Sequence, residues 1–406
     1  MSADGVMTNS SIEFPFCQNE LDDFHTFFHE IHFKLSLCIC LFGCITNVLN
    51  FLVLTRKDLR THINYILAGL AISDFFVMLV YVPYALDYAF HINTRLERLT
   101  YSYAHYVYGH AMLSQTAHTI SIFLTIILAL WRYVSVCHPT RKTIIMNNTL
   151  LAIVASYIIS PIICLPYYMT LGIRSDDIYV YRHNQTEIKG NTANYTDLLF
   201  IASAESEDGT VEIQKITKYY VHTSKFYQNH NQAFLWVYSV IIKLLPCILL
   251  TFFSLQLIRA LYEAKKRKEK LTGNQQMSMK LLTKKKQADR TTRMLIAVLF
   301  LFLITEFPQG ILGLMSAVLH QDFYLHCYQR LGDLMDFLAL LNSSINFILY
   351  CTMSRQFRDA FSQIFLPRSL THKRRIANGN GHNGFVEMDS NGRHIETMHE
   401  TQMTQL

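Results

Sequence analysis

Seven stretches of about 20 mostly apolar residues alternate with polar segments along the chain. The stretches 35–54, 106–130 and 150–171 hold no Asp, Glu, Lys or Arg, the stretches 63–86, 234–257 and 294–319 hold one each, and 331–350 holds two. At a rise of about 1.5 Å per residue, each can cross a bilayer core of about 30 Å as a helix. The pattern predicts membrane spans at about 34–55, 62–87, 105–131, 150–171, 233–258, 293–319 and 330–352.

These spans define the predicted fold class, an all-α membrane protein with a seven-transmembrane helix bundle over residues 34–353. A short amphipathic eighth helix is expected at 354–365, on the cytoplasmic side. The tail 366–406 is rich in Asn, Gly, His and Thr without an apolar period, which is typical of a disordered segment.

Basic residues give the orientation. The segment 1–33 has six acidic residues and no Lys or Arg, whereas residues 259–293 carry twelve Lys and Arg against three acidic residues. Under the positive-inside rule the N-terminus lies outside the cell and the C-terminus in the cytoplasm. The polar loop 172–232 is then extracellular and the basic loop 259–292 intracellular, where it meets anionic lipids.

Composition agrees with a membrane protein. Apolar residues make up 51% of the chain and charged residues 16%, against about 25% charged in soluble proteins. The mean hydropathy is +0.18. An ordinary cytosolic enzyme and a disordered chain are excluded. The N-x-Ser/Thr glycosylation acceptors Asn9, Asn184 and Asn194 fall on the predicted outer side.

Short motifs then narrow the class, since they occur in order and each on its own span. They are Gly43 and Asn47 in the first span, residues 70–74 in the second, 131–133 in the third, Pro246 in the fifth, Phe302 and Pro308 in the sixth, and Asn346, Tyr350 and 357–361 at the end of the seventh. Together they resemble the rhodopsin-like G-protein-coupled receptors over nearly all of residues 31–365. Residues 118–125, 243–247 and 342–350 look like the invertebrate myosuppressin receptor group, with myoinhibitory-peptide and FMRFamide receptors as close competitors.

The resemblance implies partners and roles. It implies a short amidated neuropeptide as ligand, a heterotrimeric G protein, for which the subfamily favours the Gi/o class, and arrestin as a further partner at the plasma membrane. By the same resemblance the G protein engages Arg132 and Tyr133, and the core switch comprises Ile122, Pro246 and Phe302. An activation cluster able to hold sodium at Asp74 comprises Asp74, Ser121, Asn342, Asn346 and Tyr350.

The sequence departs from the family pattern at several positions. Trp131 replaces the acidic residue before Arg132, Glu306 replaces the switch Trp two residues before Pro308, and Phe347 replaces the Pro after Asn346. The family's detailed activation scheme is therefore in doubt for this chain.

The ligand class is approached by elimination. Amine receptors resembling this chain use an Asp where Ser114 stands, and opsins a Lys where Leu340 stands, so amines and retinal are disfavoured. Acids at the mouth of a pocket suit a peptide Arg. The predicted ligand contacts are Tyr84, Asp87, Ser114, Gln115, His118, Lys243, Glu306, Gln309 and Asp336. Two alternatives stay open: Asp333 in headgroup water, and His118 as a packed core residue.

Two pairings are predicted. The resembling receptors usually have a disulfide between the third span and the second outer loop. It is missing here, because Val107 stands at the third-span position and 172–232 has no Cys. Cys17 and Cys327, the two cysteines left on the outer side, are predicted to pair, and the alternative is two free thiols. Lys243 is the only charge in 234–257 and Glu306 the only one in 294–319; they are predicted to pair because a lone charge in hydrocarbon is costly. Alternatively, Glu306 is protonated, or each residue contacts the ligand separately.

Rival classes are disfavoured. Neither rings of charge nor paired broken helices, as in channels and transporters, are visible. His105, His110 and His118 do not form a metal-ligand set on one helix face. No catalytic residue, no cofactor, no metal beyond the sodium at Asp74 and no nucleic-acid partner is expected.

Overall fold

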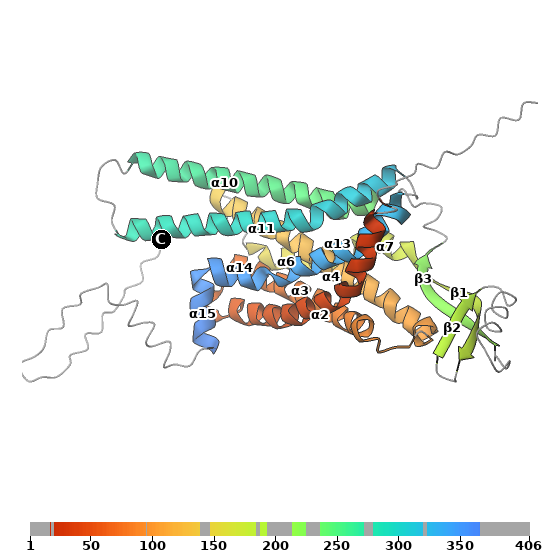
Figure 1. Cartoon of the computed structure of the whole chain (residues 1–406). Helices are drawn as coiled ribbons and strands as arrows, with labels where there is room; N and C mark the ends of the chain where they lie inside the picture. The colour runs from red at the N-terminus through yellow and green to blue at the C-terminus, as the bar shows by residue number, and fades with distance from the viewer. Residues whose placement is uncertain are drawn as a thin grey trace, which may run out of the picture. The chain divides into compact units, whose positions relative to one another are not determined.

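A computed structural model describes residues 17, 20–94, 96–138, 147–183, 187–192, 213–224, 236–271, 279–319 and 323–365. Within these residues seven helical segments are long and apolar enough to cross a membrane, which confirms the predicted seven-span fold. Figure 1 colours these segments from red near the N-terminus to blue near the C-terminus. The predicted glycosylation sites Asn9, Asn184 and Asn194 and the tail 366–406 lie outside the described residues.

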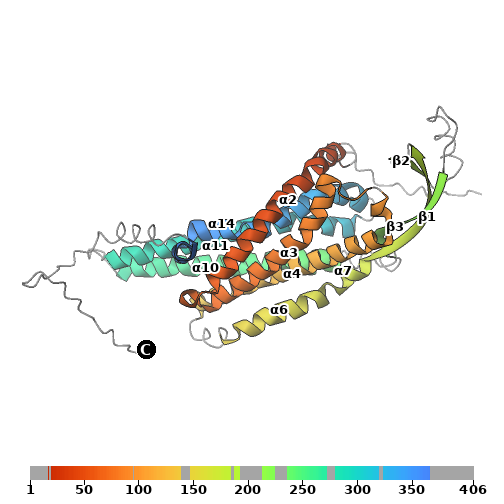
Figure 2. The ribbon, with the colours of Figure 1, turned by 90° about the horizontal axis from the view of Figure 1, so that it is seen from below.

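Several of the helices continue beyond the apolar stretches. The spans are α2 (Glu20–Leu54), α3 (His62–Phe90), α4 (Tyr101–Cys137), α6 (Thr149–Ile163) with α7 (Leu165–Thr170), η3 (Val237–Leu244) with α10 (Leu245–Leu271), α11 (Met279–Val318), and α13 (Gly332–Ser344) with α14 (Asn346–Met353). Short helical turns are η1 (Lys57–Leu59), η2 (Glu97–Leu99), η4 (Tyr324–Tyr328) and η5 (Gln329–Leu331), and α15 (Arg355–Phe365) follows the seventh span. Figures 1 and 2 show α10 and α11 running side by side beyond the other helices.

The alternating direction of the spans defines two ends of the bundle. At one end α2 and α4 begin and α3 finishes, and a small sheet follows α7; we call this the sheet end. At the other end α4 finishes shortly after Arg132; we call this the Arg132 end.

No strand was expected in the loop 172–232, yet the structure has a three-stranded antiparallel sheet there. β1 (Leu171–His183) lies between β2 (Glu187–Thr192) and β3 (Ile213–Thr223), with Leu171 opposite Thr223 and Tyr181 opposite Ile213. β-branched and aromatic residues at 178–181 and 219–221 favour strands. Lys215 and Thr217 on β3 donate to Asp177 on β1, and they hold the pKa of that carboxyl below its ordinary value.

The interior of the bundle is built from apolar clusters between the spans. One cluster joins Ile122 of α4, Cys247 of α10 and Phe302 of α11, all at most 2% exposed. Large apolar side chains such as Ile45 and Leu150 face outward and are more than 60% exposed. Lipid tails can cover such an exterior, because they are as apolar as the side chains themselves.

Glycine allows α11 to approach η3 closely. A Cβ at Gly310 would lie 2.8 Å from Leu244 Cδ2 and 3.2 Å from Lys243 Cβ. We expect Gly310→Ala to lower the stability of the detergent-solubilised protein by about 1–3 kcal/mol through overpacking. Thermal unfolding measures this, with Gly109→Ala as the control, because a Cβ at Gly109 meets nothing within 4 Å. An unchanged Gly310→Ala midpoint would contradict the close packing.

Candidate functional site

A cavity of about 250 Å³ lies inside the bundle towards the sheet end. Its walls come from α4, α7, η3, α11, η4 and α13. Gln115, Gln309 and Asp336, three of the predicted ligand contacts, line it. Pockets for whole small molecules typically measure about 300–1,000 Å³, so this cavity suits one or two side chains of a larger molecule.

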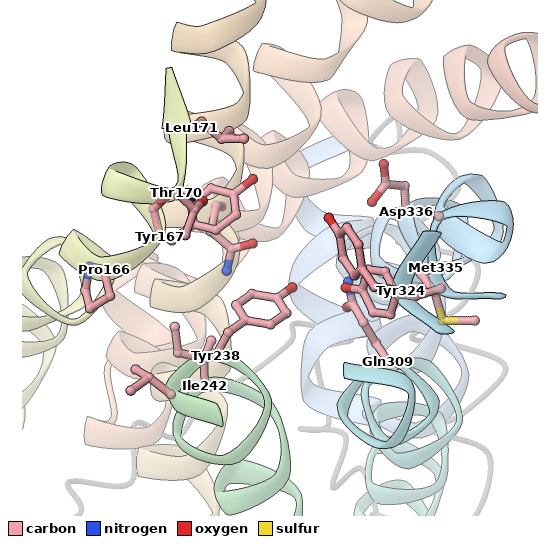
Figure 3. Close-up of a pocket in the computed structure, with 14 residues that line it drawn as sticks. Pro166, Tyr167, Thr170, Leu171, Tyr238, Ile242, Gln309, Tyr324, Met335 and Asp336 are labelled. Carbon is pink, nitrogen blue, oxygen red and sulfur yellow. Dashed lines mark hydrogen bonds between the residues drawn. The ribbon is translucent and has the colours of Figure 1, made fainter. Parts of the chain in front are cut away.

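The chemistry of this cavity is one carboxylate among phenol rings. Figure 3 shows Tyr167, Tyr238 and Tyr324 around it, with Asp336 on the opposite side from Tyr167. Tyr328 completes a set of four tyrosines in the wall. Asp336 is exposed to the cavity and forms no hydrogen bond with any described residue. A carboxylate left without a partner in such a place is suited to bind a cation.

The four tyrosines were not among the ligand contacts expected from the sequence. They come from α7, η3 and η4, which lie far apart in the sequence, and a helical spacing links only Tyr324 and Tyr328 within η4. The only available signal was their position near the predicted ends of spans. Ser114, in contrast, was predicted to contact ligand and does not line the cavity.

A buried ionic cluster joins three spans beside the cavity. Lys243 Nζ lies 2.9 Å from Glu306 Oε2, as predicted, and His118 Nε2 lies 3.1 Å from Glu306 Oε1. Lys243 and Glu306 are at most 1% exposed and His118 is 6% exposed. The His118 and Glu306 atoms are close enough for an ion pair, but their orientation does not form a hydrogen bond. We call these residues the Glu306 cluster.

The Glu306 cluster does not line the cavity. One link is Tyr238, which lines the cavity and whose ring centroid lies 5.8 Å from Lys243 Nζ. Direct ligand contact by the cluster, as expected from the sequence, would therefore require a rearrangement of the wall. The cluster is placed to sense such a rearrangement, because η3, α4 and α11 all supply one member.

Asp87 was predicted to contact ligand, and its surroundings oppose that prediction. Tyr103 donates to Asp87 Oδ2 at 2.5 Å, and the backbone and side-chain nitrogens of Asn93 donate to Oδ1 at 2.8 and 2.9 Å. Arg98 Nε lies 3.2 Å from Oδ2. A carboxylate has about four acceptor positions, so these three hydrogen bonds and the ion pair with Arg98 leave little room for a ligand. Asp87 is 3% exposed and holds the turn after α3 in place.

Tyr84 and Asp333 also have partners within the protein. The Tyr84 ring stacks on His110 with centroids 4.4 Å apart, and neither residue lines the cavity. Asp333 Oδ2 lies 2.7 Å from His29 Nδ1 of α2. The alternative of Asp333 in headgroup water is thus replaced by a contact between the first and seventh spans.

Asp74 lies deeper and is fully buried. Ser121 Oγ donates to Asp74 Oδ1 at 2.7 Å, and Asn346 Nδ2 donates to Oδ2 at 2.9 Å. Ser121, Asn342 and Asn346 line an adjoining cavity of about 40 Å³. Such a volume holds one or more waters, and the oxygen-rich donor set fits a hard cation such as sodium.

The same small cavity extends to Arg132 and Tyr350. No carboxylate in the described part of the chain pairs with Arg132. Trp131, in place of the family's acid, donates from Nε1 to Thr149 Oγ1 at 2.9 Å and so ties α4 to α6. The Tyr133 ring lies 5.7 Å from that of Phe253 on α10. Pro246 adjoins Cys247, so all three core-switch residues lie in or next to the cluster of Ile122 and Phe302.

Comparison with known proteins assigns the family. The family model described as serpentine type 7TM GPCR chemoreceptor Srw matches residues 34–368. The G-protein coupled receptor dmsr-1 of Caenorhabditis elegans is 29% identical over 372 residues, covering 84% of this chain and 69% of that protein. The sex peptide receptor of Drosophila melanogaster is 28% identical, with 81% and 71% covered. The FMRFamide receptor of Drosophila melanogaster is 22% identical, with 81% and 52% covered.

Proposed function

Because the chain belongs to the serpentine type 7TM GPCR chemoreceptor family, a family of signalling receptors and not of enzymes, we propose that its ligand is a short amidated neuropeptide. The peptide is of the myosuppressin or FMRFamide type and ends in Arg-Phe-amide. The names of two relatives support a peptide ligand, since one is a sex peptide receptor and one an FMRFamide receptor. The cavity with its unpartnered carboxylate is the observation that carries the proposal.

The cavity chemistry fits the end of such a peptide. The peptide Arg pairs with Asp336, because a guanidinium binds a carboxylate through two parallel hydrogen bonds. The peptide Phe packs against the tyrosine rings, since aromatic pairs attract beyond the area they bury. The amidated end is neutral, so Asp336 does not repel it, and Gln115 and Gln309 offer donors and acceptors for an amide.

Orientation follows from the same proposal. The sheet end faces outside, where a peptide arrives, and the Arg132 end faces the cytoplasm. There Arg132 and Tyr133 contact the heterotrimeric G protein, of the Gi/o class, and arrestin binds after activation. The basic residues of 259–292 flank this surface and meet anionic lipids of the inner leaflet. Sodium bound at Asp74 stabilises the resting arrangement of the spans.

A peptide panel tests the function. Cells expressing the receptor are exposed to amidated peptides ending in Arg-Phe-amide, to the same peptides with a free C-terminal carboxylate, and to amidated peptides without Arg. Second-messenger levels are read with and without an inhibitor of Gi/o coupling. We expect responses to the first group only, removed by the inhibitor. Responses restricted to amidated peptides without Arg would favour the myoinhibitory type, and a response to none would contradict the proposal.

Asp336→Asn is expected to lower peptide affinity by about 10- to 100-fold, because a hydrogen bond to a charged group contributes about 1.5–3 kcal/mol. The measurement is competition binding with the Arg peptide and with a peptide carrying neutral citrulline instead. The citrulline peptide should bind the wild type and Asp336→Asn about equally. If both peptides lose the same affinity on substitution, Asp336 does not pair with the peptide Arg. Asp177→Asn, in the sheet, is the matched control.

A further inference from the structure

Two histidines and a carboxylate meet where the first span lies against the seventh. His25 and His29 are one turn apart on α2, and Asp333 is in the first turn of α13. One ligand atom from each residue lies within 4.8 Å of the other two. His29 Nδ1 and Asp333 Oδ2 are already 2.7 Å apart. None of the three lines the cavity assigned to the peptide.

We propose that His25, His29 and Asp333 form a Zn²⁺ site that bridges α2 and α13. Imidazole nitrogen and carboxylate oxygen are ordinary zinc ligands, and three protein ligands leave a fourth position for water. Tetrahedral zinc with bonds of about 2.0–2.2 Å holds its ligand atoms about 3.4 Å apart. The present spacing reaches that value by small side-chain rotations, which His29 can make because it is exposed.

Neighbouring contacts hold the two walls of this site in place. The disulfide between Cys17 and Cys327 joins the segments that precede α2 and α13. Asp22 and Arg330 form an ion pair across the same junction. One turn deeper, the Phe28 and Phe337 rings pack edge to face with centroids 6.0 Å apart. Ligands carried by fixed elements cost little entropy to bring together, which favours binding.

The simpler interpretation is that His29 and Asp333 form a hydrogen-bonded pair and bind no metal ion. His25 distinguishes the two readings. Its ring stacks on His29 with centroids 5.6 Å apart and 24° between the planes, and it forms no hydrogen bond with any described residue. A pair alone does not need His25, whereas a metal site does. Bound zinc would stabilise the contact between the first and seventh spans, because a ligand favours the state that binds it.

Zinc titration of the purified full-length receptor in nanodiscs tests the site. Binding is followed by calorimetry, and Co²⁺ absorption in the visible range reports tetrahedral coordination. The variants are His25→Ala, His29→Ala and Asp333→Asn. We expect each to weaken Zn²⁺ binding by at least about tenfold, since loss of even an outer partner costs that much. His105→Ala is the matched control, because His105 is an exposed histidine on α4, and it should bind as the wild type does.

His25→Ala decides the question, because it leaves the His29–Asp333 contact intact. Equal Zn²⁺ affinity in the wild type and in His25→Ala would overturn the proposal and assign the ion elsewhere, for example to the tail histidines His372, His382, His394 and His399. Absence of binding by the wild type would overturn it as well. Thermal unfolding with and without Zn²⁺ shows that each variant is folded. The titration contains no peptide, so its outcome is independent of the proposed ligand.

Discussion

Replacing Glu306 with alanine is expected to destabilise the receptor by about 3–5 kcal/mol, because it leaves the buried Lys243 charge without its partner. Lys243→Ala should cost less, since His118 remains beside Glu306. The double variant should lose less than the sum of the two single losses, because neither charge is then left unpaired. Thermal unfolding in detergent and the amount of receptor at the cell surface measure these differences.

The exchange variant, Lys243→Glu with Glu306→Lys, is a sharper test of geometry. It keeps one charge of each sign on η3 and α11 but places a Lys beside His118 instead of a Glu. We therefore expect the exchange to recover only part of the loss, and to recover more when His118→Gln is added. Purely additive single effects, with no recovery by the exchange, would show that Lys243 and Glu306 are not coupled.

Basal signalling extends this prediction to activation. If the Glu306 cluster ties η3 and α4 to α11 in the resting state, its loss frees the sixth span and raises G-protein activation without peptide. Peptide entering the cavity would reach the cluster through Tyr238, which lies between them. Variants that reach the surface yet show unchanged basal output would limit the cluster to a structural role.

The pairing of Lys243 with Glu306 could be predicted because charge is so costly in hydrocarbon. Lys243 is the only full charge in 234–257 and Glu306 the only one in 294–319, and mutual neutralisation is the main way to lower that cost. His118 carried no such signal, since a neutral imidazole is tolerated in a core and the sequence left its role open. The structure adds it as the second partner of Glu306.

Other parts of the site depend on long-range contacts that apolar patterning does not encode. Asp87 lies at the outer end of a span, where a ligand contact is expected. The structure shows instead that Asn93 and Arg98, from the loop after this span, contact its carboxylate oxygens. The sheet has a similar origin. Its strands are readable as β-prone runs, but their pairing joins 171–181 with 213–223 across a long connection. The spans, in contrast, could be predicted from continuous apolar stretches, because each span is a local feature of the sequence.

Replacing Cys17 or Cys327 with serine is expected to lower stability by about 2–5 kcal/mol, the usual cost of removing a native disulfide. The bond closes a loop between positions 310 residues apart and pins the start of the first span to the segment before the seventh. It also lies in an apolar cluster with Phe323, 5% exposed, so serine loses packing as well as the bond. Thermal unfolding of the purified receptor measures the loss.

The double variant separates the bond from its surroundings. Because the two cysteines share one bond, Cys17→Ser with Cys327→Ser should be hardly less stable than either single variant. A reductant should lower the unfolding temperature of the wild type and leave that of the double variant unchanged. Cys38→Ser is the control, since Cys38 is an exposed free cysteine. Peptide mapping without reductant that recovers Cys17 and Cys327 unlinked from the native receptor would contradict the pairing. The ion pair of Asp22 with Arg330 and the packing of the Phe28 ring against Phe337 would then still join the spans that carry His25, His29 and Asp333.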